Sequence, residues 1–234
     1  MVLARVALPG GRDLGVFREE VVKASNGQLQ YGVMHARDLL WSKYPHFCPE
    51  SEAPELRKMM QHLFLCFALC NGLSVRPGDD GAPEYAGASP DEIALAEAAG
   101  TVGISLVSRR PGRRGDVMKV VMEQVDGDET GNNYTQSELP YAVLDVVDFN
   151  SDRKRMSIIV KKQGGGNEPE ILCFTKGADN IMTPLHTTGL SSIEQQHLNE
   201  YSCLGLRTLI IAPKSLESNF ATRWLTSPRP RRAR

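Results

Sequence analysis

Three apolar runs separated by short polar breaks constrain the fold of this chain more than any other feature. The runs are Tyr141–Phe149, Met156–Lys161 and Ile171–Lys176, and each has the length and composition of a β-strand. The second break contains Gly164-Gly165-Gly166-Asn167, which is typical of a hairpin loop. Strands that follow one another through short loops pair antiparallel, so the sequence predicts an antiparallel sheet.

The rest of the sequence adds helices and further strands. Helical spacing of apolar residues over Glu55–Gly72 predicts one long helix. In Ser89-Pro90-Asp91-Glu92, a serine cap, a proline at the first helical position and a glutamate three residues after the serine predict the start of another. We expect an α/β (α+β) fold in which helices flank a central antiparallel β-sheet. The helix that starts at Ser89 continues over Ile93–Ala99. The other expected elements are strands at Ile104–Val107, Val117–Glu123 and Arg207–Ala212, the last of them buried, helices at Ala178–Leu185 and Ser191–Leu204, a hairpin turn near Asn26-Gly27, and loops over residues 42–55 and 74–88.

Composition argues against several classes of protein. A net charge of −1 favours neither a nucleic acid nor a membrane surface as partner. The longest apolar run, Leu63–Cys70, is far shorter than the roughly 20 residues that span a bilayer. We therefore expect no transmembrane segment in this chain and a cytosolic location. The five cysteines form no CxxC pair, so reduced thiols are expected, with Cys66 and Cys70 in the core.

The pattern along the chain suggests one folded domain with two extensions. Residues 1–16 carry little pattern, and residues 17–216 hold the expected helices and strands. Residues 217–234 are basic and rich in proline, so we expect this tail to be disordered.

Phe149 is the first candidate for a binding function. It ends a strand but is followed by the polar run Asn150–Arg155, whereas a core strand would continue apolar. One interpretation is an ordinary core residue. The other is a stacking surface for a nucleotide base, where an aromatic contact contributes about 1–3 kcal/mol.

Lys176 and Gly177 are the next candidates, because a lysine ends an apolar strand just before a glycine. The lysine could be an ordinary exposed residue at a strand end. Alternatively it could be a point charge toward a nucleotide, with Gly177 permitting close approach.

Glu92 and Arg207 also have two interpretations each. Glu92 could close a capping box with Ser89, or it could accept a hydrogen bond from an exocyclic amine of a base. Arg207 enters an apolar segment and needs a partner, either a buried carboxylate or a bound phosphate.

Common catalytic motifs do not occur in this sequence. There is no GxxxxGKS/T loop, no GxGxxG fingerprint, no HExxH and no GxSxG, and the five histidines are scattered. We therefore predict no catalytic residue and no metal ligand in this chain.

Five segments in this order resemble the nucleotide-binding domain of P-type ATPases, specifically of the phospholipid-translocating (flippase) branch. The similarity covers about residues 17–216, and Phe17–Gly32 resembles the linker that follows the phosphorylation motif in that family. The matching segments are Leu69-Cys70-Asn71, Tyr85–Leu95, Val147–Val160, Phe174–Asp179 and Gly205–Ala212.

The resemblance implies that this domain binds ATP and presents its γ-phosphate to an aspartate on a separate phosphorylation domain. In that family Phe149 would stack on adenine, Glu92 would meet the base edge, and Arg207 would reach toward the phosphates. Lys176 would line the adenosine pocket. The implied binding residues are Glu92, Phe149, Ser151, Lys176, Gly177 and Arg207.

The sequence also departs from the family. The phosphorylated Asp-Lys-Thr-Gly-Thr motif is absent, and so are the segments that bind Mg²⁺ and the membrane helices. We expect a domain of a larger pump, or a truncated product of its gene, that is inactive alone. The phosphorylation, actuator and membrane domains would be its partners, phospholipid would be bound only by the membrane helices, and an accessory subunit is a further candidate partner.

Two alternatives remain open from the sequence. The chain could be a non-catalytic nucleotide-binding or protein-interaction module derived from such a pump. It could also bind nucleic acid through Arg153–Arg155 and the C-terminal arginines. No aromatic residues are interleaved with these arginines, so we do not expect a nucleic-acid partner.

Overall fold

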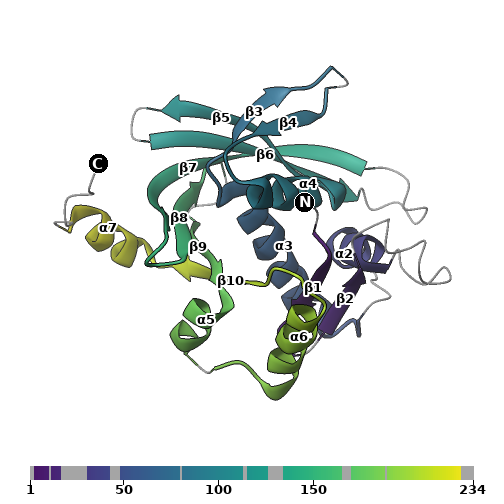
Figure 1. Ribbon diagram of the computed structural model, residues 1–234. Coiled ribbons are helices and arrows are strands. Elements are labelled where there is room, and N and C mark those ends of the chain that lie inside the picture. Colours follow the sequence, from purple (N-terminus) through teal and green to yellow (C-terminus); the bar gives the residue numbers. More distant parts are fainter. Residues whose placement is uncertain are drawn as a thin grey trace.

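Six strands form one antiparallel sheet in the order β10-β9-β8-β7-β6-β5, so each strand pairs with its neighbour in sequence (Figure 1). The computed structural model describes residues 3–10, 12–16, 31–42, 48–79, 81–112, 115–125, 134–164, 170–187 and 189–227. The predicted antiparallel sheet is confirmed. Its strands are β5 Ile104–Gly112, β6 Gly115–Val125, β7 Tyr134–Asn150, β8 Arg155–Lys162, β9 Ile171–Ala178 and β10 Leu209–Leu216.

The core lies between one face of this sheet and two helices, α3 (Ala53–Leu69) and α4 (Pro90–Thr101). Phe64 of α3 and Phe174 of β9 are both fully buried there. Cys66 and Cys70 are buried as predicted, and burial raises the pKa of the Cys66 thiol well above its ordinary value. Apolar side chains therefore hold α3 and α4 to the sheet, which fixes where the start of α4 lies.

The first residues of the chain have more structure than their sequence pattern indicates. Strands β1 (Arg5–Leu8) and β2 (Arg12–Val16) pair antiparallel and place apolar side chains in the main core, and helix α2 spans Tyr31–Trp41. The turn predicted near Asn26-Gly27 lies outside the described residues. Strands of four or five residues carry too few alternating positions to be recognised from sequence alone.

Residues 74–88, predicted as a loop, contain a second short two-stranded ribbon. Strands β3 (Ser74–Pro77) and β4 (Pro83–Ala86) pair antiparallel. Tyr85 ties this ribbon to the sheet because its hydroxyl donates to the Leu106 carbonyl at 3.1 Å. The loop prediction was wrong because these short strands are stabilised by contacts with β5 rather than by a local apolar pattern.

The C-terminal part corrects two predictions. β10 is an edge strand that begins at Leu209, and its side chains are half-buried or exposed rather than buried. Helix α7 spans Ser218–Thr226, within the tail that was expected to be disordered, and residues 228–234 lie outside the described residues. The two predicted helices between β9 and β10 are confirmed as α5 (Asp179–Met182), which continues into a 3₁₀ turn, and α6 (Ser192–Cys203).

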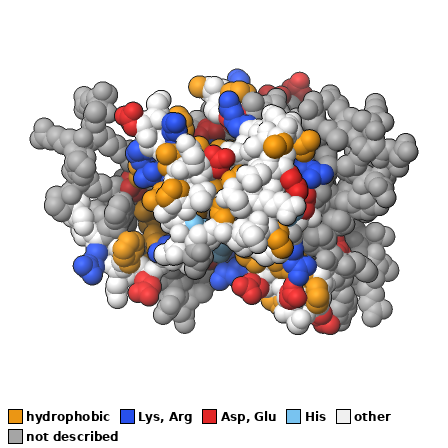
Figure 2. Space-filling view, turned by 60° about the horizontal axis from the view of Figure 1, so that its bottom comes forward, with side chains coloured by type: hydrophobic (Ala, Val, Ile, Leu, Met, Phe, Trp, Pro, Cys, Tyr) orange, Lys and Arg blue, Asp and Glu red, His pale blue; other side chains and the backbone are white. Residues whose placement is uncertain are grey.

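Acidic and basic side chains are interspersed on the face shown in Figure 2. Within the described ranges, no helix combines the length and apolar character needed to cross a bilayer.

Asn71 lies two residues after the end of α3, and its buried side chain links that helix to the segment leading into β3. Its Nδ2 donates to the carbonyls of Phe67 at 3.2 Å and Ala68 at 2.8 Å, while its Oδ1 accepts from the Leu73 N–H at 3.2 Å. These bonds satisfy groups that the helix end would otherwise leave without partners.

Replacing Asn71 by alanine should lower the free energy of unfolding by about 2 kcal/mol, because buried backbone groups lose their partners. Urea denaturation of the domain measures this change. Asn199→Ala is a matched control, since the Asn199 side chain is exposed and accepts a hydrogen bond from Gln195 within α6. Equal stability of the two variants would contradict the role given to Asn71.

A complete capping box begins α6. Ser191 Oγ accepts from the Glu194 N–H at 3.3 Å, and the Glu194 carboxylate accepts from the Ser191 N–H at 2.6 Å. The bond from the Ser191 backbone lowers the pKa of Glu194 below its ordinary value.

A group whose pKa is lower in the folded protein stabilises the fold above its unfolded pKa, and this contribution is lost as the pH falls. Glu194→Gln should therefore lower the thermal unfolding midpoint at pH 7, and the difference should shrink below about pH 4.3. Glu84→Gln, on an exposed position of β4, should leave the midpoint unchanged throughout. A difference that grows on acidification would rule out this assignment.

Candidate functional site

Phe149 lies at the end of β7, where the strand carries a β-bulge. Two residues, Asp148 and Phe149, stand opposite the single residue Met156 of β8. Such a bulge breaks the regular alternation of side chains and re-aims them. Phe149 is 62% exposed, so its interpretation as an ordinary core residue is wrong.

Hydrogen bonds from backbone N–H groups hold the turn that follows the bulge. Asn150 Oδ1 accepts from the Asp152 N–H at 2.7 Å, and Lys154 adopts a left-handed backbone conformation with φ of 46°. The Lys154 carbonyl accepts from the Ala178 N–H of β9 at 3.1 Å. Ser151, the first residue of this turn, is exposed.

The bulge residues, Met156 of β8 and Lys176 of β9 lie opposite one another on three adjacent strands, and we call this line of positions a row across the sheet. Met156 pairs with Lys176 of β9, and pairing residues on adjacent strands point to the same face of a sheet. Neighbouring strands lie about 4.8 Å apart, so the backbones at Phe149 and Lys176 are about 10 Å apart. An exposed aromatic residue and a lysine thus lie on one row, within the dimensions of a nucleotide.

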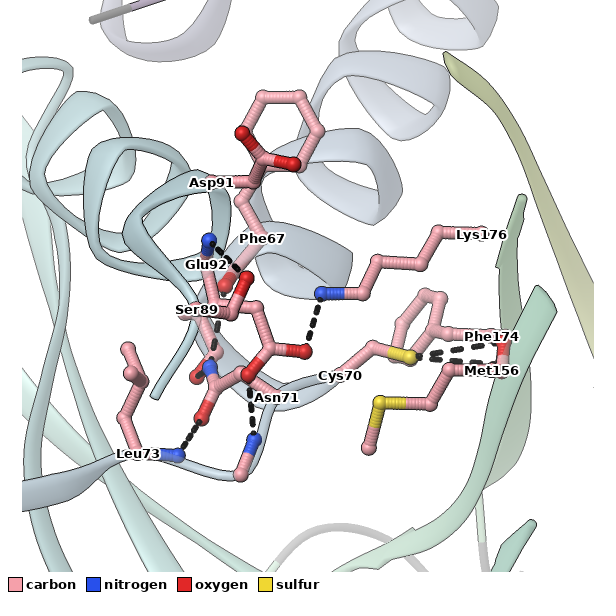
Figure 3. A network of polar contacts seen from close by, with 12 residues as sticks. Phe67, Cys70, Asn71, Leu73, Ser89, Asp91, Glu92, Met156, Phe174 and Lys176 are labelled. Atoms are coloured by element: carbon pink, nitrogen blue, oxygen red, sulfur yellow. Dashed lines mark hydrogen bonds and ion pairs between the residues drawn. The ribbon is translucent and has the colours of Figure 1, made fainter. Parts of the chain in front are cut away.

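Lys176 is buried and forms an ion pair with Glu92, near the start of α4 (Figure 3). Its Nζ donates to Glu92 Oε1 at 2.9 Å, and the other carboxylate oxygen accepts from the Gly72 N–H at 2.9 Å. The side chains of Lys176 and Glu92 are only 10% and 16% exposed. The interpretation of Lys176 as an exposed strand-end residue is therefore wrong, and its buried charge is compensated by a carboxylate.

Glu92 does not complete a capping box. Ser89 Oγ accepts from the Glu92 N–H at 3.4 Å, as the sequence predicts, but the Glu92 carboxylate bonds to Gly72 and Lys176 instead. Glu194 of α6, in the same sequence relation to its serine cap, does close the box. At Glu92 the bonds to Lys176 and Gly72 take the place of a bond to the Ser89 backbone, so this carboxylate faces the sheet.

Arg207 lies just before β10 rather than inside a buried strand. Its Nη1 donates to Asp91 Oδ2, and its side chain is 66% exposed. The partner expected for this arginine is thus a carboxylate of α4, the residue adjacent to Glu92. Asp91 and Glu92 thus each form an ion pair with a basic residue that we had predicted to bind a nucleotide.

Packing within the protein is sufficient to explain the glycine at position 177. A Cβ atom at this position would lie 2.7 Å from the Cβ of Arg155, 3.0 Å from the Lys154 carbonyl oxygen and 3.0 Å from Met182 Cγ. Any side chain would therefore clash with β8 and α5, and this alone explains the glycine.

The structure brings four of the six proposed residues to the region where α4 meets β9 and β10, and Phe149 and Ser151 to the adjoining turn. It adds Asp91 and Gly72, which sequence reasoning did not select. Asp91 was visible as the residue before Glu92, but its partner lies 116 positions away. Within the described ranges, no group of three or more His, Cys, Asp or Glu side chains comes close enough together to hold a metal ion.

The ion pair between Glu92 and Lys176 should be strongly coupled. Removing one charge leaves the other buried, so Glu92→Gln and Lys176→Met should each lower the free energy of unfolding by about 3 kcal/mol. The double variant should lose less than the sum, with a coupling energy of about 2 kcal/mol in urea denaturation.

The exposed pair of Lys119 and Glu138, joined at 2.7 Å, is the matched control. Its coupling should be only a few tenths of a kcal/mol. Additive effects at Glu92 and Lys176 would contradict the account of a buried ion pair.

Comparisons with known proteins show the family of this chain. A family model described as "P-type ATPase, cytoplasmic domain N" matches residues 59–230. The chain is 29% identical over 210 residues to the mouse protein phospholipid-transporting ATPase FetA, which covers 88% of this chain and 16% of the relative. It is 35% identical over 164 residues to human phospholipid-transporting ATPase ID, with 69% of this chain and 12% of the relative covered.

A yeast protein is similar to the same extent. Phospholipid-transporting ATPase DNF2 of Saccharomyces cerevisiae is 32% identical over 209 residues, with 76% of this chain and 12% of the relative covered. The chain thus spans between 12% and 16% of the length of these relatives. Because the family model matches well over half of the chain and the fold is a helix-flanked antiparallel sheet, the chain belongs to the family of P-type ATPase cytoplasmic N domains.

Proposed function

We propose that this chain is the ATP-binding domain of a phospholipid-translocating P-type ATPase. The observation that carries the proposal is the exposed ring of Phe149, on one row of the sheet with the buried pair of Lys176 and Glu92. A family whose N domain implies nucleotide binding, and relatives named as phospholipid-transporting ATPases, support it. We propose residues 17–216 as the nucleotide-binding domain, with apolar side chains of β1 and β2 contributing to its core.

Each proposed residue has a role that follows from its chemistry. Phe149 stacks on the adenine ring, and Glu92 accepts a hydrogen bond from the exocyclic amine of the base. Lys176 need not leave Glu92 to take part, because an ammonium group has three N–H donors and the ion pair occupies one.

The remaining residues act at the edges of this pocket. Ser151 lies two positions after the stacking ring, in the exposed turn. Gly177 keeps the backbone beside Lys176 free of a side chain, and the exposed guanidinium of Arg207 grips the phosphates.

Affinity should be low, because one stacking contact and a few polar bonds must offset the cost of ordering the nucleotide. We expect a Kd on the order of 1 mM, or about −4 kcal/mol.

In the whole protein this domain would deliver the γ-phosphate of ATP to an aspartate on a phosphorylation domain outside these 234 residues. Closure of the two domains around a hinge would bring the phosphate to its acceptor. Charge neutralisation by Mg²⁺ would come from ligands in those other parts, and phospholipid would be moved by membrane helices. The chain of 234 residues should therefore bind ATP without becoming phosphorylated.

The proposal is tested by titrating the domain with ATP while following backbone amide shifts. Shifts should cluster at Phe149, Lys176 and Glu92. Phe149→Ala should weaken binding about 5- to 150-fold, since the lost stacking is worth about 1–3 kcal/mol.

Phe220→Ala is the control, because Phe220 of α7 is a second phenylalanine with a largely exposed ring, at 53%. Its replacement should leave ATP affinity unchanged. If several millimolar ATP shifts no resonance, the nucleotide proposal fails and a protein-interaction module derived from such a pump becomes the better account.

A further inference from the structure

Two consecutive carboxylates at the start of α4 hold two cations that come from β9 and from the segment before β10. Glu92 pairs with Lys176, and Asp91 pairs with Arg207. These contacts join residues 84 and 116 positions apart in the sequence. Figure 3 shows the Asp91 and Glu92 side chains beginning at the same end of the helix.

Local sequence forces both carboxylates to this position. Ser89 caps the helix and Pro90 is its first residue, so Asp91 and Glu92 fall in the first turn. Carboxylates are favoured there by the partial positive charge of a helix N-terminus. Since α4 is packed against the sheet, the backbone positions from which both side chains extend are fixed.

The two ion pairs differ in how readily they can be exchanged. The pair of Glu92 and Lys176 is nearly buried on both sides. The Arg207 side chain is 66% exposed, whereas that of Asp91 is 23% exposed. Arg207 can therefore swing to a different partner at small cost, while Asp91 stays where the helix places it.

The ion pair between Asp91 and Arg207 also uses only one of the two carboxylate oxygens. Arg207 engages Oδ2 of the carboxylate, and Oδ1 is buried with no hydrogen-bond partner among the described residues. A phosphate group can accept two parallel hydrogen bonds from a solvent-exposed guanidinium. A phosphate thus competes well for Arg207, and the Asp91 charge opposes its approach.

We propose that Asp91 is an intrinsic competitor of the nucleotide phosphates for Arg207, and so lowers the affinity of the domain for them. This inference rests on the proposed nucleotide function and names the regulation of that site. The carboxylate holds Arg207 when no phosphate is present, and binding of the phosphates exchanges one anion for the other. Adenosine, which has no phosphate, is indifferent to Asp91.

The test is to measure ATP, adenosine and pyrophosphate binding to the domain and its variants by amide shifts at constant ionic strength. Asp91→Asn should tighten ATP and pyrophosphate binding about two- to fivefold, the range expected for an exposed ion pair. Adenosine affinity should not change. Arg207→Gln should weaken ATP binding and remove the effect of D91N in the double variant.

Glu138→Gln is the control for net charge. It removes one charge from an ion pair near the other end of β7, about 35 Å along the strand from Phe149. It should leave the affinity for ATP and pyrophosphate unchanged. Equal tightening by E138Q and D91N would overturn the proposal, because only the net charge would then matter.

The outcomes separate this inference from the nucleotide proposal. Weaker or unchanged pyrophosphate binding by D91N overturns the inference, and in the first case Asp91 positions Arg207 instead of competing for the phosphates. If ATP shifts Phe149 and Lys176 but D91N has no effect, only the inference fails. If D91N tightens pyrophosphate binding while ATP leaves Phe149 unshifted, the competition stands and the purine pocket is refuted.

Discussion

The ion pair between Glu92 and Lys176 is the interaction on which the site depends. It joins the first turn of α4 to the row of the sheet that leads to the bulge at Phe149. Because both side chains are nearly buried, the pair holds helix and sheet at one distance and in one orientation. Glu92 also accepts from the Gly72 N–H, in the segment between α3 and β3. The first turn of α4, strand β9 and the segment after α3 therefore meet at a single carboxylate.

This arrangement is compatible both with the stability of the fold and with the proposed binding function. A lysine buried without a partner would be destabilising, and a carboxylate that merely capped its own helix would not face the sheet. Pairing the two keeps both charges in place, and the lysine still has N–H donors to spare. In the neighbouring pair of Asp91 and Arg207 the arginine side chain is largely exposed, so we expect this pair to contribute less to stability, in keeping with its proposed exchange with a phosphate.

Much of the fold could be predicted from the sequence, since it follows local rules. Alternating apolar runs with short breaks indicated the antiparallel sheet, and serine caps marked the starts of α4 and α6. Local rules do not predict the elements that depend on tertiary contacts. The ribbon of β3 and β4 and the strands β1 and β2 are too short to show a pattern, and α7 was hidden by the basic composition around it.

The candidate site shows the same division. Phe149 and Lys176 could be selected from residue type and neighbours, but the bulge that exposes one and the burial of the other depend on strand pairing. Glu92 illustrates the limit best, because its sequence context is that of Glu194 while its hydrogen bonds differ. A contact between residues 84 positions apart decided the outcome, and no local pattern reports it.

The most direct test of the account is a measurement of nuclear Overhauser contacts between the protons of bound adenine and the aromatic side chains of the domain. The account predicts contacts from the adenine H2 and H8 protons to the ring of Phe149, together with contacts to the methylene groups of Lys176. Contacts to another ring such as Phe220, with none to Phe149, would contradict it.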